Sequence, residues 1–292
     1  IGTDVSYYKI GDTVLVTLIR SCGECISCST GKPTCCETRY DVVSGPLQTL
    51  GGGAMQQGLA TGAFAEKVVV DQSQIQTIPE DISMASASLL ACGVITGMGA
   101  VTNTAQVSTG STVVVIGAGG VGLNAIQGAA IAGASKIIAI DVSKEKLDAA
   151  KEFGATDGIL TSEEKPYRIV KKMTGGRGVD YVFVTVGSIP AYESASRFLS
   201  VGGSVVMVGM PPSGAKVAIE PVILATTSQS LLGSYMGSSV LKKDIPILIN
   251  LYQQGRLKLD ELVTRQYSLN EINEAVNDVK LGNTRRNVIV FD

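Results

Sequence analysis

The stretch STVVVIGAGGVGLNAIQGAAIAGA, Ser111 to Ala134, decides the fold. Its first part, Ser111–Gly117, has the length and the β-branched content of a strand that is buried on both faces. The small-residue segment Val121–Ala134 that follows is long enough for a helix. The turn between them, GAGGVG, is therefore a glycine-rich loop at the N-terminus of a helix, where unpaired N–H groups bind phosphate.

The three glycines of GAGGVG have separate tasks in a dinucleotide site. Gly117 permits the tight turn, Gly119 lets the backbone approach a pyrophosphate, and Gly122 allows the helix to pack closely on the strand. The complete predicted loop comprises Gly117, Gly119, Gly120, Val121 and Gly122. Turn glycines in a sheet with another ligand, as in methyltransferases, are the alternative, but the full spacing favours a dinucleotide.

Asp141 ends the next predicted strand, about 20 residues beyond the loop. An acid at this place can accept hydrogen bonds from the adenosine ribose hydroxyls, and it would repel a 2′-phosphate. The sequence therefore predicts NAD, rather than NADP, as the cofactor.

Strand and helix alternate from about residue 94 to residue 235. Strands are predicted at 111–117, 136–141, 157–160, 180–186, 203–209 and 230–235, with helices at 121–134, 143–154, 165–173 and 191–199. Near-continuous apolar strands separated by helices are typical of a parallel sheet covered on both faces. The predicted fold class is α/β, with a doubly wound Rossmann sheet.

The flanking segments have a different character. Residues 1–93 hold short strand-like runs, Asp12–Ile19 and Gly62–Asp71, between Gly- and Cys-rich loops, which indicates an irregular, mostly β domain. After residue 235 two more helices are predicted, the second beginning at a Ser268/Glu271 capping box and ending at Gly282. A last strand is predicted at 287–292.

Composition excludes several functions. The 292 residues are 45% hydrophobic and carry a net charge of −2 with no long run of one sign, which argues against a nucleic-acid or anionic-membrane surface. Gly, Ser or charged residues are expected to break the apolar runs before the roughly 20 residues of a membrane span. No signal peptide opens the chain, so a cytoplasmic protein with a small-molecule substrate is predicted.

The stretch CGECISCSTGKPTCCE, Cys22 to Glu37, holds five of the six cysteines, and the chain has no histidine. Four thiolates at the spacing of Cys22, Cys25, Cys28 and Cys36 suit a closed tetrahedral zinc site, which contributes folding energy rather than catalysis. An iron–sulfur cluster uses the same ligand type. A disulfide framework fits a large chain with its own core poorly. Cys35 is expected to point away from the cluster.

The sixth cysteine, Cys92, lies in LLACGVITGMGA. Free cysteine is among the most buried residue types, so Cys92 by itself is predicted to be a small buried residue at a domain junction.

The strand, the GAGGVG loop and helix, Asp141 and the four-cysteine lobe together resemble the zinc-dependent medium-chain dehydrogenases, in detail an alcohol dehydrogenase close to the class III, formaldehyde-dehydrogenase-like branch. YKIGDTV at 8–14, CGVITGMGA at 92–100 and the segment 244–292 resemble the family throughout. The resemblance implies a β-rich, GroES-like catalytic domain at 1–93 and 236–292, an NAD-binding domain at 94–235, and a homodimer or homotetramer.

Residue roles follow from the same resemblance. It implies that the four cysteines hold a structural zinc and that Cys92 is one ligand of a catalytic zinc, which reverses the reading of Cys92 by itself. Further implied sites are Thr96 near the nicotinamide, Asp141 and Lys146 at the adenosine ribose, Gly187 and Val208 along the cofactor cleft, and Arg286 at the pyrophosphate.

The sequence departs from the family at its start. The KIGD turn, Lys9–Asp12, normally follows a strand, and the N-terminal segment that carries the first catalytic-zinc cysteine and a Gly-His-Glu motif is not found in residues 1–292. We therefore expect an N-terminally incomplete chain. A catalytic zinc needs about three protein ligands, and Cys92 is the only one that can be named.

Three functions remain after these observations. The first is a zinc-dependent oxidoreductase that transfers a hydride between NAD and a primary alcohol, or a thiol adduct of formaldehyde. The second is a non-catalytic NAD-binding protein with a structural zinc, or a truncated inactive chain. The third is a zinc-free quinone or enone reductase, but such relatives usually lack the cysteine lobe and favour NADPH. Met236–Ser238 and Met98 are candidates to line a substrate pocket.

Overall fold

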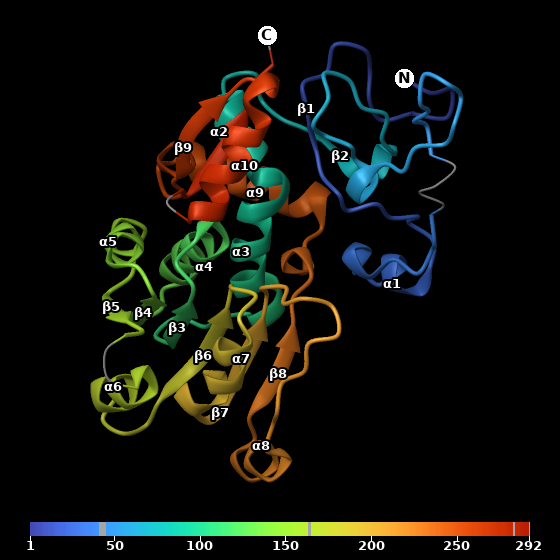
Figure 1. The fold of residues 1–292 in the computed structure, drawn as a ribbon. Helices are drawn as coiled ribbons and strands as arrows, with labels where there is room; N and C mark the ends of the chain where they lie inside the picture. Colours follow the sequence, from blue (N-terminus) through green and yellow to red (C-terminus); the bar gives the residue numbers. More distant parts are fainter. Residues whose placement is uncertain (41–44, 163–164, 283, 292) are drawn as a thin grey trace. The chain divides into compact units, whose positions relative to one another are not determined.

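The computed structural model describes residues 1–40, 45–162, 165–282 and 284–291. These residues fall into two compact units (Figure 1). Unit 1 consists of Ile1–Cys92 and Ser239–Asp292, and unit 2 of Gly93–Ser238.

Unit 2 is built on a six-stranded sheet with the order β5-β4-β3-β6-β7-β8 (Figure 1). All neighbouring strands are parallel, which confirms the predicted sheet. Its strands are β3 (Thr112–Ile116), β4 (Lys136–Asp141), β5 (Asp157–Leu160), β6 (Val179–Val184), β7 (Leu199–Met207) and β8 (Ser230–Gly233). The chain winds outward from β3 first to one side and then to the other, so the strand order reverses beside β3. In sheets of this kind a ligand binds at that reversal, outside the carboxyl ends of the strands.

Helices connect these strands: α4 (Gly120–Ile131), α5 (Lys144–Glu152), α6 (Pro166–Met173), α7 (Ile189–Ala195) and α8 (Pro221–Thr227). The predicted N-cap of α5 is confirmed, because the Ser143 hydroxyl accepts a hydrogen bond from the backbone N–H of Lys146 at 3.3 Å. After α5 the chain turns at Gly154, whose φ of +111° favours glycine.

The core of unit 2 follows from the alternation of side chains along its strands. Val114 and Ile116 of β3 belong to one buried cluster, which also includes Val170 of α6 and Phe198. Helices α4 and α5 contact the same central strands. Each fully buried Val, Ile or Phe contributes roughly 1.5–3 kcal/mol, so this sheet is a rigid support for the loops at its carboxyl edge.

One helix, Met84–Ala105, is long and apolar enough by length and composition to cross a membrane, with a mean hydropathy of 1.7. The expectation that Gly and Ser would break such a run was therefore too strict. The structure buries 67% of the window, as in the core helix of a globular protein. The helix comprises α2 (Met84–Leu89), a π-helical turn (Leu90–Val94), α3 (Ile95–Gly99) and a second π-helical turn (Ala100–Ala105).

Within unit 2, α3 packs against α4 so closely that a glycine is required. A Cβ on Gly97 would lie 2.4 Å from the carbonyl oxygen of Val121. This contact fixes the N-terminal turn of α4, the helix that follows the glycine loop.

Among its described residues, unit 1 contains two small sheets and, besides α2, three further α-helices. Strand β1 (Val14–Val16) is antiparallel to β2 (Ile75–Thr77), and β9 (Val263–Tyr267) is parallel to β10 (Arg286–Ile289). The helices are α1 (Ile26–Ser29), α9 (Leu241–Gln253) and α10 (Ile272–Leu281).

Two local predictions for unit 1 are confirmed. The KIGD turn has a backbone hydrogen bond from Asp12 N to Lys9 O at 3.2 Å. The Ser268/Glu271 capping box forms just before α10, and the helix ends at Gly282 with φ +77°. Both features are encoded within a few residues, which is why the sequence discloses them.

The strand predicted at Gly62–Asp71 was wrong. These residues form no strand with any part of the chain that the structure describes, and the side chain of Gln57 bonds the carbonyl oxygen of Val69 at 2.7 Å. The run Asp12–Ile19 yields only the short β1, and the sequence did not indicate β2 or β9. A strand needs a partner as well as a pattern, and partners lie far away in sequence.

Candidate cofactor and metal sites

The four cysteines predicted to bind zinc come together in unit 1. The Sγ atoms of Cys22, Cys25, Cys28 and Cys36 all lie within 4.8 Å of one another, and those of Cys22 and Cys28 are 4.0 Å apart. Sulfurs bound at about 2.3 Å to a tetrahedral zinc are about 3.8 Å apart. The donor set and its spacing therefore fit zinc.

Backbone N–H groups point at these sulfurs and favour their ionised form. Cys22 Sγ accepts from the N–H of Glu24 at 3.4 Å and of Cys25 at 3.3 Å. A hydrogen bond from the Thr38 side chain and these two N–H groups lower the pKa of the Cys22 thiol to about 6. Burial raises the pKa of the Cys28 thiol to about 12. Metal binding favours the deprotonated form of cysteine ligands.

An aromatic and ionic contact connects the cysteine lobe to the rest of unit 1. The hydroxyl of Tyr40 lies 3.9 Å from Cys36 Sγ, and the Arg20 guanidinium stacks 3.8 Å from the centre of the Tyr40 ring. Arg20 also forms an ion pair with Asp71 at 3.6 Å. Through these contacts, residues that are not themselves metal ligands help to orient the Cys36 side chain.

The other two cysteines lie outside this group. Cys35 is exposed, in keeping with the prediction that it points away from the cluster. Cys92 is also exposed and lies in the π-helical turn Leu90–Val94, so the reading of it as a small buried residue was wrong. Each π-helical hydrogen bond spans one residue more than an α-helical bond does, so the side-chain positions around Cys92 do not follow the ordinary helical pattern.

The glycine loop of unit 2 contains two glycines that the fold requires and one that faces open space. Gly117 has φ +95°, and a Cβ on Gly122 would lie 1.8 Å from the carbonyl oxygen of Gly117. A Cβ on Gly119, in contrast, would meet nothing within 4 Å. Gly119 directly precedes α4 at its N-terminus. The open space therefore lies where the N–H groups of the helix begin.

Asp141, at the end of β4, is 7% exposed. Its carboxylate connects the glycine loop to the turn that follows β4. Its carboxylate accepts backbone N–H groups from Ala118 at 2.7 Å, from Val142 at 2.7 Å and from Ser143 at 3.1 Å. Three of roughly four acceptor positions are thus used by the protein itself. The sequence predicted a ribose ligand but gave no sign of this second role.

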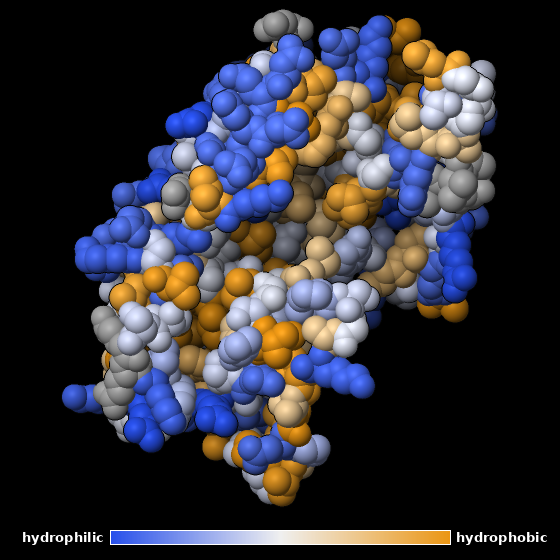
Figure 2. Space-filling model, in the orientation of Figure 1, coloured by the Kyte–Doolittle hydropathy of each residue, from blue (hydrophilic) through white to orange (hydrophobic). Residues whose placement is uncertain are grey.

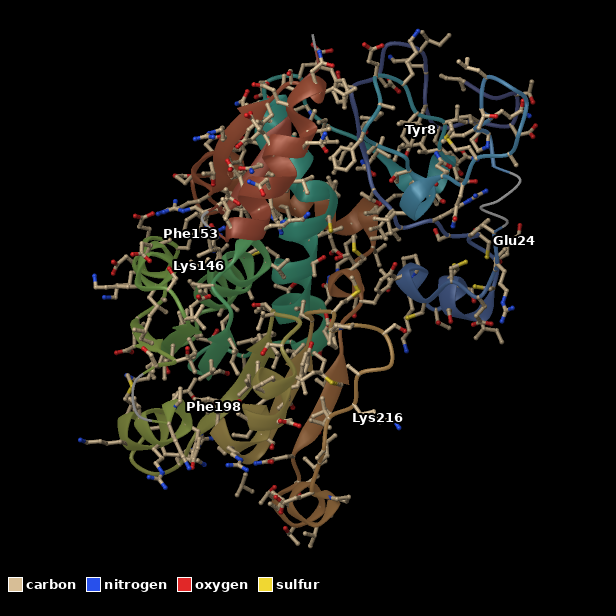
Figure 3. The ribbon with its side chains drawn as sticks, viewed as in Figure 1. Tyr8, Glu24, Lys146, Phe153, Phe198 and Lys216 are labelled. Carbon is tan, nitrogen blue, oxygen red and sulfur yellow. The ribbon has the colours of Figure 1, made fainter. Side chains whose placement is uncertain are left out.

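A cavity of about 410 Å³ opens at the carboxyl ends of β3 and β4. Asp141 and Lys146 line its polar side, and Tyr167 and Phe198 line its apolar side. Figure 3 labels two of these residues, Lys146 and Phe198. The two aromatic rings are edge to face with centroids 6.5 Å apart. The cavity has room for a planar base beside a ribose. Sequence reasoning missed both aromatic residues, because they follow no motif.

The remaining predicted residues of unit 2 lie toward β6, β7 and β8. Gly187 follows β6, and a Cβ there would lie 2.4 Å from the carbonyl oxygen of Met210. Val208 follows β7, and its N–H bonds Val184 O at 3.1 Å. Thr96, on α3, is 8% exposed and its hydroxyl lies 3.7 Å from Met236 Sδ.

Arg286 and Cys92 belong to unit 1, where Arg286 begins β10. Burial lowers the pKa of the Arg286 guanidinium, and Cys92 opposes that shift. The structure therefore places these two predicted residues within electrostatic reach of each other. It does not bring Cys92 into any group of three or more Cys, Asp or Glu ligands among the described residues.

Comparison with known proteins gives the family. A profile described as "Zinc-binding dehydrogenase" matches residues 120–254, and one described as "Alcohol dehydrogenase GroES-like domain" matches residues 1–80. A relative called NDMA-dependent alcohol dehydrogenase, from Amycolatopsis methanolica, is 33% identical over 99% of this chain and 80% of its own length. The chain belongs to the zinc-binding alcohol dehydrogenase family.

Other members of the family have a similar sequence identity to this chain. A probable S-(hydroxymethyl)glutathione dehydrogenase of Schizosaccharomyces pombe is 35% identical over 99% of this chain and 78% of its own length. The crystal structure of benzyl alcohol dehydrogenase from Acinetobacter calcoaceticus has a TM-score of 0.92 with 31% identity, covering 100% of this chain and 81% of the other. This alcohol dehydrogenase homologue thus has the family's GroES-like and Rossmann-type folds, and its class is oxidoreductase.

Proposed function

We propose that this member of the alcohol dehydrogenase family transfers a hydride between NAD and an alcohol or aldehyde. The observation that carries the proposal is the GAGGVG turn, in which Gly117 and Gly122 are needed by the fold whereas the space above Gly119 is open. Family membership supports the reaction class, and the names of the relatives support alcohols as substrates.

NAD binding is supported along the whole carboxyl edge of the unit 2 sheet. The N–H groups at the start of α4 would receive the pyrophosphate. Asp141 and Lys146 would hold the adenosine ribose, and the cavity walled by Tyr167 and Phe198 would take the base. The negative charge of Asp141 disfavours a 2′-phosphate, so NAD is the proposed cofactor.

The other half of the dinucleotide would then extend over β6, β7 and β8, past Gly187, Val208 and Thr96. NAD supplies the hydride chemistry when it is bound. The residues of unit 2 named here would hold and orient it. We propose unit 2 as the NAD-binding domain, unit 1 as the catalytic domain, and Arg286 as a pyrophosphate contact.

The cysteine lobe would hold a structural zinc through Cys22, Cys25, Cys28 and Cys36. The described residues do not provide a second complete set of ligands for a catalytic zinc. Among the described residues Cys92 belongs to no group of three or more possible ligands, and the sequence contains no histidine. We therefore derive no step through a second zinc, although Cys92 is exposed and free to act as one ligand.

Primary alcohols and a thiol adduct of formaldehyde are the proposed substrate classes. The first is supported by the benzyl alcohol dehydrogenase relative, and the second by the S-(hydroxymethyl)glutathione dehydrogenase relative. A cytoplasmic location stays a prediction.

A second candidate function is NAD binding without turnover, and the isolated position of Cys92 favours it. Two measurements distinguish the two candidate functions. The first is the zinc content per chain by elemental analysis. The second is NAD reduction, followed at 340 nm, with a panel of primary alcohols and with formaldehyde plus a thiol. One zinc and no reduction by residues 1–292 would favour the second candidate. Two zincs with reduction would establish the oxidoreductase in the chain itself. Loss of activity in Cys92→Ser, with one zinc retained, would then identify the catalytic metal.

We further propose a homo-oligomer that uses the open sheet edge at β8. This edge strand has no neighbour on one side in the described sheet. Val222 and Ile223 of the preceding α8 are 66% and 42% exposed. Figure 2 shows hydrophobic atoms at the surface where Figure 1 draws α8. The double variant Val222→Asp/Ile223→Asp should shift the sedimentation coefficient to that of a monomer, and the control Val201→Asp, also an exposed valine of unit 2, should not. A monomeric unaltered chain would contradict the proposal.

A further inference from the structure

Three consecutive residues after β8 have a left-handed backbone. Met236, Gly237 and Ser238 have φ values of +49°, +67° and +50°. Met and Ser carry a Cβ, which makes the left-handed conformation unfavourable for them. Strain of this kind persists only where the surroundings hold it, and it gathers at ligand-binding segments.

The hydroxyl of Thr104 holds this turn at both ends. Thr104 Oγ1 lies 2.8 Å from Ser234 Oγ and 2.8 Å from Ser238 Oγ. A hydroxyl has one proton and two acceptor positions, so Thr104 can bond both serine hydroxyls at once. The middle of the turn lies against α3, where a Cβ on Gly237 would be 2.2 Å from Ile95 O.

The turn lies at the carboxyl edge of the sheet, on the side away from Asp141. It follows β8, and the N–H of Ser234 bonds the carbonyl of Met207, the last residue of β7, at 3.0 Å. Adenosine binding at β4 requires the nicotinamide half of NAD to lie over the β6–β8 half of the sheet. The turn also carries Met236, whose sulfur is 3.7 Å from the hydroxyl of Thr96.

We propose that Thr104 is a positioning residue for the nicotinamide half of the cofactor. It does not touch NAD; it keeps the Met236–Ser238 turn in its strained form, so that the turn is already shaped when NAD arrives. Without the bridge the turn relaxes, and NAD binding must restore it at a cost in affinity. The inference rests on the proposed binding of NAD and deepens it.

The test uses Thr104→Val, which keeps the shape of the side chain and removes its hydroxyl. Dissociation constants are measured for NAD and for ADP-ribose, which lacks the nicotinamide. Thr104→Val should weaken NAD binding about tenfold, or about 1.4 kcal/mol, and change ADP-ribose binding less than twofold. Ser238→Ala should give the same pattern, and Thr104→Ser should restore NAD binding. The matched control is Thr102→Val, since the Thr102 hydroxyl bonds Met98 O on its own helix at 3.1 Å and should alter neither ligand.

Three outcomes overturn the inference. Equal weakening of NAD and ADP-ribose, with a lower melting temperature, would show a general structural role. Unchanged affinity for NAD in folded Thr104→Val and Ser238→Ala would show that the bridge positions nothing. Failure of the unaltered chain to bind either ligand would overturn the NAD proposal itself, which separates that failure from the first two.

Discussion

Replacing Cys28 by serine is expected to reduce the zinc content from one per chain to a trace and to unfold the lobe Cys22–Cys36. The lobe has almost no core of its own, because neither α1 nor the short helical turn Pro33–Cys35 contains a buried residue. Structural zinc contributes apparent binding free energies of about 10–16 kcal/mol in small zinc domains, which is comparable to the whole stability of a domain. If the proposed zinc is bound, the metal rather than apolar burial would fold the lobe.

The experiment combines elemental analysis with cleavage by a glutamate-specific protease. Glu24 and Glu37 are exposed in and beside the lobe, so its unfolding should increase cleavage there severalfold. The matched control is Cys35→Ser, because Cys35 is exposed and outside the metal group. It should retain zinc and resist the protease. NAD affinity should be retained in both variants, since the glycine loop lies in unit 2. Full zinc content in Cys28→Ser would contradict the four-cysteine site.

Replacing Gly119 by alanine is expected to weaken NAD binding at least tenfold, about 1.4 kcal/mol, without altering the fold. The added methyl group meets no protein atom within 4 Å, and the φ of Gly119, −78°, suits an ordinary residue. It would occupy only the space proposed for the pyrophosphate. The melting temperature should therefore stay the same, while the dissociation constant measured by calorimetry rises.

Gly122→Ala is the contrasting variant. Its methyl group would lie 1.8 Å from the backbone oxygen of Gly117, so the strand and the helix must separate. Overpacking of this kind costs about 1–3 kcal/mol, which lowers the melting temperature of a domain of this size by about 2–4 °C per kcal/mol. If both variants lost stability equally, the distinction between a packing glycine and a ligand-facing glycine would be wrong. If Gly119→Ala bound NAD normally, the pyrophosphate would lie elsewhere.

Local patterns in the sequence were sufficient for a large part of the fold. The six parallel strands, the glycine loop, the N-cap Ser143 and the Ser268/Glu271 box are each encoded within a few consecutive residues, and the structure has them all. The four cysteines are also close in sequence, so a short loop brings their sulfurs together. Such features depend on backbone conformation and side-chain spacing over one or two turns.

Other features depend on residues that are far apart in the chain. The pairing of β9 with β10, the lack of a strand at 62–71, and the aromatic wall of Tyr167 and Phe198 carry no local signal. The two roles of Asp141 show the limit clearly: its position predicted a ribose ligand, but its bond to Ala118, 23 residues away, appears only in the folded sheet.

The sequence by itself determined the architecture, the family resemblance and the donor atoms for zinc. Only the tertiary structure decided which backbone is strained, which carboxylate already accepts three backbone hydrogen bonds, and which hydroxyl bridges two distant serines. The physical reason is that Thr104 and Ser238 are 134 residues apart. A hydrogen bond over that separation depends on how α3, α4 and the sheet pack, and no periodicity in the sequence records such packing.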